Sequence, residues 1–432
     1  MRSIAHEYLG DREMRIMRML LKYGRSYREL TIDEARVSEI IRGKEGPGLA
    51  DPATAVKRAL KDPIGAGRLS EIARGKKNVV VVVNDITRPT PYGFMLPPLL
   101  EELKEAGTPA ETIKFVVATG LHRGQAPREM EDLYGQEVVG RSRFLNHDCD
   151  GDLVSLGKLR SGNELFVNRQ VAEADLVVTT GVIGPHYFAG FSGGRKSILP
   201  GVAGRQTVQN NHSMFVRTGV LTGRLEKNPI HEEMLEAARR VGVDFILNVV
   251  TNTSREIVEV VAGDLEQAWL KGVKTFTEMY RVPIRARSDV AIASAGGYPK
   301  DINLYQAQKA LENAAVLVRD GGTVVLLAEC PEGSGDATFE EWMRAAKNPD
   351  EIINRLKERF VMGGHKAYAF ATVLRKKEVV LISGLGKRFA EEMLFTHAGS
   401  LEEALEYLRK KHGDGYRAAI LPEAGAVMPV LA

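Results

Sequence analysis

The segment Lys77-Asn-Val-Val-Val-Val-Val-Asn84 is the strongest indicator of fold in this sequence. Its valine run is bounded by polar residues and is too short for a helix, which is typical of a strand buried on both faces of a parallel sheet. A helical pattern follows at Leu96–Ala106. It has Pro97 and Pro98 near its start and Gly107 just past its end, as helices prefer. The sequence therefore predicts a βα unit.

The same alternation of short apolar runs and helical patterns continues along the chain. Further strands are expected at Ile113–Ala118, Leu176–Thr180, Phe245–Val250, Asp289–Ser294, Thr323–Ala328, Glu378–Ser383 and Arg417–Leu421. Helices are expected at Asn303–Ala315 and, two or three in number, between Thr338 and Leu374, while Gly321-Gly322 is expected to form a turn. The first 75 residues read as a strand-containing lead-in.

These elements predict an α/β fold with two α/β domains and mainly parallel sheets. At about 150 residues per domain, a chain of 432 residues has room for two or three. We place the boundary near residue 285, which gives an N-terminal domain of residues 1–284 and a C-terminal domain of residues 285–432. The active site is expected in the crevice between them.

Composition excludes several classes of protein. The chain carries 59 Lys and Arg against 56 Asp and Glu, so it lacks the basic excess of a general nucleic-acid binder. The N-terminus Met1-Arg-Ser-Ile-Ala-His-Glu7 has no apolar core for a signal peptide, and no run is long enough for a membrane span. Two cysteines cannot form a disulfide framework or a thiolate zinc site by themselves. We expect a soluble cytoplasmic enzyme.

Ionisable residues follow several of the predicted strands. In open α/β sheets, ligands bind beyond the carboxyl ends of the strands. Four such ends carry the segments Asn84-Asp-Ile-Thr-Arg88, Thr119-Gly-Leu-His-Arg123, Gly181-Val-Ile-Gly-Pro-His186 with its continuation to Ser197, and Ala295-Gly-Gly-Tyr-Pro-Lys300. The sequence thus predicts that arginine, histidine and lysine side chains gather at one edge.

Each of these residues also has a purely structural interpretation. Asp85 and Arg88 could pair and brace their turn, and His122 could be an ordinary loop histidine. His231 is expected to open a solvated helix. The segment His147-Asp-Cys-Asp150 has a metal-like composition, but without a partner pair nearby it is expected to be a surface loop.

Two nucleotide-binding motifs are close but incomplete. Gly190–Ser197 resembles a phosphate-binding loop in which Arg195 replaces the second glycine, which disfavours nucleoside triphosphate hydrolysis. Gly384-Leu-Gly386 lacks the third glycine of the dinucleotide fingerprint, which disfavours a nicotinamide dehydrogenase. Two histidines with an arginine and lysines suit acid–base chemistry on a small carboxylate, and two bases are what a racemase or epimerase requires.

The segment Gly184-Pro-His-Tyr-Phe-Ala-Gly-Phe-Ser-Gly-Gly-Arg-Lys-Ser-Ile-Leu-Pro-Gly201 resembles the signature of the nickel-pincer lactate racemase family. The other motifs of that family occur in the same order, namely Asp85-x-Thr-Arg88-Pro, Thr119-Gly-Leu-His-Arg123, Asn211-His212 and Gly296-Gly-Tyr-Pro-Lys-Asp301. The motifs span residues 75–310, and the two-domain pattern extends the resemblance to the whole chain.

The resemblance implies a cofactor. In this family it is a pyridinium-3-thioamide-5-thiocarboxylic acid mononucleotide, a nickel pincer that holds the metal through two sulfurs and a ring carbon. Lys196 would carry the covalent thioamide link and His212 would be the protein ligand of nickel. Further cofactor contacts are expected from a set of small and polar residues, namely Asp85, Thr87, Gly190, Ser192, Gly193 and Gly194, with Asp85 supporting either the cofactor or Arg88.

The resemblance also implies catalytic and substrate-binding roles. His122 and His186 would be the paired acid–base groups, one removing the hydroxyl proton while the substrate α-hydrogen moves to the cofactor as hydride. The other would return a proton after reduction from the opposite face. Arg88, Lys300 and Tyr298 would bind the substrate. The N-terminal domain would carry the cofactor and histidines, and the C-terminal domain would close over the substrate.

The substrate class is a 2-hydroxy acid, either lactate or a more polar relative. The segment Arg359-Phe-Val-Met-Gly-Gly-His-Lys366 lacks the tryptophan of lactate-specific members, and His365 and Lys366 could accommodate a polar substrate or lie behind the site. The expected partners are this small molecule and the proteins of cofactor biosynthesis. The alternative is a non-catalytic binding or maturation protein for the cofactor, although such a protein would not need paired histidines.

Overall fold

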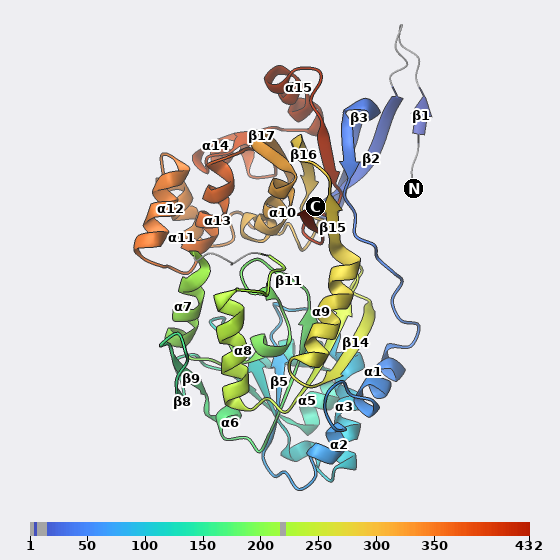
Figure 1. The fold of residues 1–432 in the computed structure, drawn as a ribbon, viewed down its shortest axis with the longest axis vertical. Helices are drawn as coiled ribbons and strands as arrows, with labels where there is room; N and C mark the ends of the chain where they lie inside the picture. Colours follow the sequence, from blue (N-terminus) through green and yellow to red (C-terminus); the bar gives the residue numbers. More distant parts are fainter. Residues whose placement is uncertain (1–3, 7–14, 217–221) are drawn as a thin grey trace. The chain divides into compact units, whose positions relative to one another are not determined.

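The computed structural model describes residues 4–6, 15–216 and 222–432. The chain forms two compact units (Figure 1). Unit 1 comprises residues 1–44 and 280–432, and unit 2 comprises residues 45–279.

The membership of the first 44 residues differs from the predicted division of the chain. Strand β4 (Val37–Ile40) adds to the edge of the unit 1 sheet by pairing in parallel with β20 (Ala418–Leu421). Leu21 and Leu30, from the hairpin before β4, are buried in the same core as Ile420. Periodicity along the chain cannot report such long-range pairing, so the predicted domain 1–284 included residues 1–44, and also residues 280–284, that belong to unit 1.

Unit 2 alternates strands and helices in the order expected. Its elements are α1 (Pro52–Lys61), α2 (Leu69–Ile72), β5 (Val79–Asn84), α3 (Tyr92–Glu105), β6 (Lys114–Ala118), α4 (Pro127–Tyr134), α5 (Gln136–Arg141), β7 (Arg143–Asn146), β8 (Leu153–Lys158), β9 (Glu164–Asn168), α6 (Arg169–Ala172), β10 (Leu176–Ile183), β11 (Pro185–His186), β12 (Gly190–Phe191), α7 (Arg205–Ser213), α8 (Pro229–Val241), β13 (Phe245–Thr251), β14 (Ile257–Gly263) and α9 (Gln267–Tyr280). Short 3-10 helices add to these, namely η2 (Ala110–Thr112), η3 (Gly194–Ser197) and η4 (Met214–Val216).

The sheet of unit 2 has the strand order β14-β13-β10-β5-β6-β7 in the described residues. Its pairs are parallel except for β13 with β14. The chain runs from β5 outward through β6 and β7, and then returns to β10 on the other side of β5. This reversal makes the β5/β10 boundary a topological switch point, where open α/β sheets bind ligands.

The valine strand is the centre of the unit 2 core. Val79 to Val83 are completely buried, as expected of a central parallel strand. Helix α3 packs near it but begins at Tyr92, so Pro97 and Pro98 lie inside the helix and not near its start. Tyr92 and Met95 are buried in the same core, and this packing explains why the helix extends beyond the expected start.

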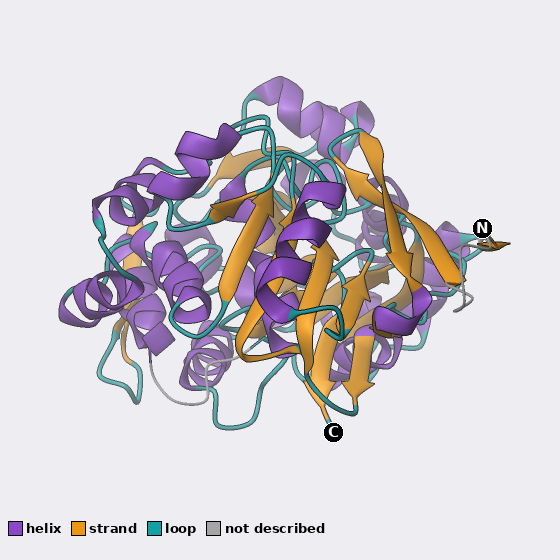
Figure 2. Cartoon of the chain, turned by 90° about the horizontal axis from the view of Figure 1, so that it is seen from above, coloured by secondary structure: helices purple, strands orange, loops and turns teal. Residues whose placement is uncertain are grey.

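Unit 1 contains the remaining elements. They are β1 (Ile4–His6), β2 (Arg15–Tyr23), β3 (Ser26–Asp33), the 3-10 helix η1 (Glu34–Arg36), β4, β15 (Arg281–Ile284), β16 (Ser288–Ser294), α10 (Leu304–Val316), β17 (Val318–Leu327), α11 (Ala337–Ala345), α12 (Pro349–Glu358), α13 (Gly364–Leu374), β18 (Glu378–Ile382), α14 (Gly386–Glu392), β19 (Thr396–His397), α15 (Leu401–His412), β20 and β21 (Met428–Leu431). Strands appear in orange among purple helices in Figure 2.

The main sheet of unit 1 is parallel, with the order β19-β18-β17-β16-β20-β4. Its switch point lies between β16 and β20, by the same reasoning as in unit 2. Gly321 and Gly322 do not form a turn between elements. They lie within β17, where β17 advances five residues while β16 advances two, from the pair Ser288–Val318 to the pair Val290–Thr323. The glycines therefore mark a β-bulge, which periodicity alone does not distinguish from a turn.

The structure otherwise confirms the predicted α/β class with mainly parallel sheets. None of the described helices combines the length and apolar character needed to cross a membrane.

Candidate functional site

The carboxyl end of β5 is held by two buried tyrosines. The Tyr92 hydroxyl lies 2.5 Å from the backbone nitrogen of Asn84, which donates to it, and the Tyr134 hydroxyl donates to the Asn84 carbonyl at 2.7 Å. Tyr92 also hydrogen-bonds Thr180 of the neighbouring strand β10 at 3.1 Å. Both backbone polar groups of Asn84, the residue before Asp85, are therefore hydrogen-bonded, which limits where the Asp85 carboxylate can lie.

Asp85 and His122 form a close pair. The Asp85 Oδ2 atom lies 2.6 Å from His122 Nδ1, and the carboxylate is buried while the imidazole is half exposed. Burial alone would raise the pKa of Asp85, but hydrogen bonds from His122 and Thr87 outweigh it and hold that pKa below its ordinary value. An ionised Asp85 keeps the His122 proton on Nδ1, so Nε2 is free to accept a proton.

Thr87 connects this pair to Arg88. The Thr87 hydroxyl donates to Asp85 Oδ1 at 2.6 Å and lies 3.0 Å from Arg88 Nη1, which donates to it. Arg88 itself is exposed. The structural interpretation in which Asp85 and Arg88 pair directly is therefore replaced by an indirect link, and the partner of Asp85 is His122. The sequence did not reveal this partner because 37 residues separate the two.

The loop after β10 positions the second histidine. It folds back as the short hairpin of β11 and β12, in which His186 pairs with Gly190. The Ala189 backbone N–H donates to His186 Nδ1 at 3.2 Å. A neutral imidazole that accepts at Nδ1 carries its proton on Nε2. His186 is therefore in the opposite tautomer to His122.

The ring of Phe188 is the meeting point of three predicted site residues. Its centroid lies 4.4 Å from that of His186 and 4.7 Å from that of His212, while Lys196 Nζ lies 5.7 Å from it. The structure thus brings the predicted catalytic, metal-binding and covalent-link residues around one aromatic side chain. Phe188 was not among the predicted site residues, although it lies inside the motif Gly184–Gly201.

His212, the predicted metal ligand, is a buried histidine with one unbonded ring nitrogen among the described residues. It lies in the last turn of α7, is buried, and its Nδ1 atom has no hydrogen-bond partner among the described residues. Burial, assisted by the positive charge of Lys196, lowers the pKa of His212 to about 3. The ring is therefore neutral at ordinary pH, and neutral imidazole is the form that coordinates metals such as nickel.

A backbone contact ties the two halves of the site together. The Gly120 N–H, two residues before His122, donates to the Gly201 carbonyl at 2.9 Å, and Gly201 ends the loop that carries Lys196. Gly201 itself has no room for a side chain, since a Cβ would lie 2.2 Å from the Ser197 carbonyl oxygen. The loops after β6 and β10 therefore approach each other closely above β5, as the strand order requires.

The glycines of the second loop serve close packing. A Cβ on Gly190 would lie 2.5 Å from the Arg224 carbonyl oxygen, and one on Gly194 would lie 3.0 Å from the Trp269 ring. The Gly194 N–H already donates to Asn248 Oδ1 at 2.9 Å, and the Ser192 hydroxyl donates to the Val182 carbonyl at 2.8 Å. The Gly194 N–H and the Ser192 hydroxyl, both in predicted cofactor-binding residues, are therefore hydrogen-bonded within the protein in this conformation. The neighbouring Gly193 is in a left-handed conformation with φ of 77°.

Lys300 and Tyr298 belong to unit 1, in the loop after β16. Lys300 Nζ lies 3.6 Å from Glu423 Oε2, and Lys22 Nζ contacts the other oxygen of that carboxylate at 2.6 Å. Glu423 follows β20, so this group sits at the switch point of the unit 1 sheet. Tyr298 is exposed and stacks with the Arg25 guanidinium at 4.0 Å.

His365 and Lys366 lie at the buried start of α13 in unit 1. Lys366 Nζ donates to Gln308 Oε1 at 2.7 Å and lies 4.7 Å from the Tyr305 ring centroid. Burial raises the pKa of the neighbouring Glu312 to about 7, although Lys366 opposes the rise. Both side chains are therefore buried among residues of unit 1.

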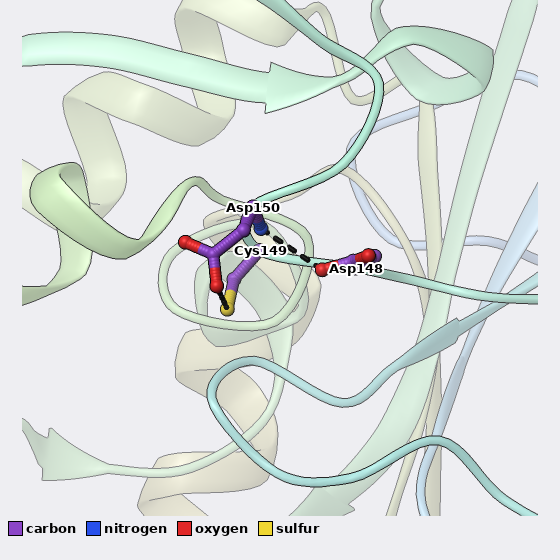
Figure 3. A group of neighbouring side chains, drawn as sticks. All are labelled: Asp148, Cys149 and Asp150. Carbon is purple, nitrogen blue, oxygen red and sulfur yellow. Dashed lines mark hydrogen bonds between the residues drawn. The ribbon is translucent and has the colours of Figure 1, made fainter.

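The acidic cluster Asp148, Cys149 and Asp150 is a group with metal-like composition, drawn in Figure 3. The Asp150 carboxylate accepts hydrogen bonds from Arg205, the shortest at 2.6 Å, so its charge is already paired. Cys149 is buried, and its thiol lies 3.7 Å from Asp150 Oδ2. The adjacent His147 is buried and contacts the Ala203 carbonyl at 3.0 Å, so only part of this segment is the expected surface loop.

Family models match both units of the chain. A model described as the lactate racemase N-terminal domain matches residues 23–222, and one described as the lactate racemase C-terminal domain matches residues 284–429.

Two curated relatives cover most of the chain. The lactate racemase of Thermoanaerobacterium thermosaccharolyticum is 36% identical over 419 residues, which is 94% of this chain and 98% of that protein. The lactate racemase of Lactiplantibacillus plantarum is 35% identical over 382 residues, which is 86% of this chain and 90% of that protein.

Solved structures share the fold. The lactate racemase apoprotein of Thermoanaerobacterium thermosaccharolyticum matches with a TM-score of 0.90 and 36% identity, covering 96% of this chain and all of that one. A Thermotoga maritima protein matches with a TM-score of 0.65 at 20% identity, covering 89% of this chain and 99% of that one, which supports the fold alone.

Proposed function

The chain belongs to the lactate racemase family, and we propose that it is a nickel-dependent racemase or epimerase of a 2-hydroxy acid. Family membership makes it an isomerase. The observation that carries the proposal is the pair His122 and His186, which follow strands β6 and β10 on either side of β5 and adopt opposite tautomers. Two unlike imidazoles at one switch point suit a reaction that must handle protons for two enantiomers.

The residues around Phe188 fit the nickel pincer nucleotide. His212 offers a buried neutral nitrogen, and Lys196 offers an amine for the covalent link. The sulfur donors would come from the cofactor, since the chain has only two cysteines. When bound, the cofactor supplies a reversible acceptor for the α-hydrogen of the substrate.

The two histidines begin the reaction in different roles. His122 Nε2 accepts the hydroxyl proton of one enantiomer, and Asp85 then faces the resulting imidazolium. His186 presents Nε2–H, which can donate a hydrogen bond to the substrate oxygen. To give up a full proton, His186 must first take a second proton from water on Nδ1, which breaks the hydrogen bond from Ala189. Donation from Nε2 then leaves a neutral ring with its proton on Nδ1. In the reverse direction Nε2 of this form accepts the hydroxyl proton, and the His122 imidazolium donates.

Binding of the substrate carboxylate is assigned to cationic side chains. Arg88 is exposed and is linked through Thr87 to Asp85, the partner of His122, and its planar guanidinium can bind both oxygens of a carboxylate. Lys300 is the second candidate, and its contact with Glu423 would be exchanged for one with the substrate. Tyr298, exposed in the same loop as Lys300, is the third substrate contact.

Lactate is the first substrate to test, because the curated relatives are lactate racemases. Larger and more polar 2-hydroxy acids form the rest of the panel. The burial of His365 and Lys366 favours selection by other residues. The proposal also includes cofactor-biosynthesis proteins as partners, because the chain must receive the cofactor from them.

The deciding experiment is co-production with the cofactor pathway, followed by intact-mass analysis and nickel measurement. We expect a covalent adduct at Lys196, one nickel per chain, and racemisation of a 2-hydroxy acid by chiral chromatography. The Lys196→Arg variant, which keeps the charge but lacks the amine nucleophile, should carry no adduct. An unmodified Lys196 without nickel under these conditions would contradict the proposal. Loading without turnover on the whole panel would favour a cofactor-binding protein.

A further inference from the structure

Arg195 is a charged side chain in the interior of unit 2. It is 1% exposed, and its guanidinium lies 4.0 Å from the ring centroid of Trp269. No acidic side chain pairs with it within the described part of the chain, and its Nη1 atom has no hydrogen-bond partner there. Burial alone lowers the pKa of Arg195 to about 9. An unpaired buried cation is costly, so packing by itself does not explain an arginine at this position.

The hydrogen bonds of Arg195 connect two segments. Its Nε donates to His231 Nδ1 at 2.7 Å, and its Nη2 donates to the Ala189 carbonyl at 2.6 Å. His231 lies in the first turn of α8, as expected, but it is 9% exposed, so the expectation that this position is solvated is wrong. Burial, followed by the charge of Arg195, lowers the pKa of His231 to about 3 and keeps it a neutral acceptor. The acceptor role of His231 could not be read from the sequence, because Arg195 lies 36 residues away.

Both peptide groups that flank Ala189 accept side-chain hydrogen bonds, one from Asn228 at the N-cap of α8 and the other from Arg195 in η3. The carbonyl of Phe188, in the same peptide plane as the Ala189 N–H, accepts from Asn228 Nδ2 at 2.8 Å. The Ala189 carbonyl, in the next plane, accepts from Arg195. Because peptide groups are planar, these two contacts restrict the direction of the Ala189 N–H. That N–H is the group that donates to His186 Nδ1.

We propose that Arg195, held by His231 and Trp269, is a positioning residue that fixes the tautomer and orientation of His186. This inference rests on the proposed function, in which His186 handles the substrate proton. The planar guanidinium can donate in two directions at a fixed angle, whereas lysine cannot reproduce this geometry. Arg195 is buried despite its charge because it must donate at a fixed angle both to His231 and to the Ala189 carbonyl.

The direct test reads the His186 ring in the full chain without cofactor. Nitrogen-15 spectra of histidine-labelled protein report which ring nitrogen carries the proton, and the His186→Gln variant identifies its signals. We expect the Nε2–H tautomer in the unsubstituted protein and a mixture of tautomers in Arg195→Met, with Arg195→Lys intermediate. Arg240→Gln is the matched control, because it removes another arginine-to-carbonyl hydrogen bond, that to Leu156, in the same unit. An unchanged His186 spectrum in folded Arg195→Met would overturn the proposal.

A second pair of variants covers the case in which Arg195→Met fails to fold. His231→Asn retains an acceptor near the position of Nδ1, whereas His231→Leu removes it at similar volume. In cofactor-loaded enzyme we expect His231→Leu to lower kcat by roughly tenfold with little change in KM, because a small misplacement of a catalytic group is costly. His231→Asn should restore most of the loss. Equal kcat values in the two variants would count against the positioning role.

The two readouts separate this inference from the proposed function. Suppose that Arg195→Met changes the His186 tautomer, but that the unsubstituted chain, loaded with cofactor, racemises no substrate. Arg195 would then still position His186, and the catalytic role of His186 would be rejected. Normal racemisation in unsubstituted enzyme, with unchanged His186 spectra in Arg195→Met, would reject the positioning role alone.

Discussion

The two histidines of the site are held in opposite ways. His122 donates to the ionised carboxylate of Asp85 and is half exposed. His186 accepts from a backbone N–H, and the groups behind it are a neutral buried His231 and Arg195, which pairs with no acidic side chain among the described residues. One histidine therefore has a negative charge behind it, while the other has a network that is neutral or positive.

This difference shows that hydrogen-bond partners can give two chemically identical side chains different tautomers. Asp85 makes His122 a proton acceptor at Nε2, and Ala189 makes His186 a donor at the same ring position. An enzyme that works on both enantiomers must pass through both arrangements. Under the proposed function, the solvent exposure of His122 would allow it to exchange protons with water between turnovers.

The largest expected effect comes from removing either histidine. In loaded enzyme, His122→Gln and His186→Gln should each lower racemisation about 10³-fold in both directions, because each enantiomer needs a group on its own side. Chiral chromatography from each pure enantiomer measures both rates. His397→Gln, on β19 of unit 1, is the control and should keep full activity. Near-normal turnover in either site variant would remove the two-histidine assignment.

A smaller effect is expected when the partner of His122 loses its charge. Asp85→Asn keeps the shape of the side chain, but its amide can donate to His122 Nδ1 and thereby move the ring proton to Nε2. His122 would then resemble His186, and kcat should fall about 10²-fold through the wrong tautomer. An unchanged nickel content in Asp85→Asn would show that the loss of kcat comes from the His122 tautomer and not from loss of cofactor. A loss of nickel with normal kcat per loaded chain would instead assign Asp85 to cofactor binding.

The smallest effect concerns stability and the network behind His186. The pKa of His231 is about 3 in the folded chain against 6.5 for an ordinary histidine, so the unfolded chain takes up its proton first as pH falls. The contribution is present above pH 6.5 and is lost progressively towards pH 3. His231→Asn should therefore reduce the loss of unfolding free energy by about 1.4 kcal/mol per pH unit at most in this window. Denaturant titrations of both proteins at pH 7 and pH 5 measure the change in unfolding free energy between the two pH values. An equal change in His231→Asn and in the unsubstituted protein would contradict the burial of a neutral His231.

Much of the fold was predictable from local patterns. Strands β5, β6, β10, β13, β16, β18 and β20 lie within a residue or a few of their expected positions, because fully buried parallel strands are short apolar runs. The helix α3 and the glycines of β17 were misplaced, because burial of Tyr92 and the bulge at Gly321 depend on neighbours far along the chain. The membership of residues 1–44 failed for the same reason.

The site was predictable by residue but not by contact. Strand ends and the family motifs led to His122, His186, Lys196 and His212, and the structure places the last three around Phe188. The pairing of Asp85 with His122 was not among the expectations. Neither was the network of Arg195, His231 and Trp269, whose members are separated by dozens of residues and carry no local signal.

The sequence by itself determined the α/β class, the family, and the reactive side chains that follow its strands, because valine runs and contiguous motifs are local properties. Only the tertiary structure decided which group each side chain meets. The strand order brings the loops after β5, β6 and β10 together. Hydrogen-bond partners then set the tautomers of His122 and His186, and burial sets the charge state of His212 and His231. Protonation depends on distance and desolvation, and these exist only once the chain has folded.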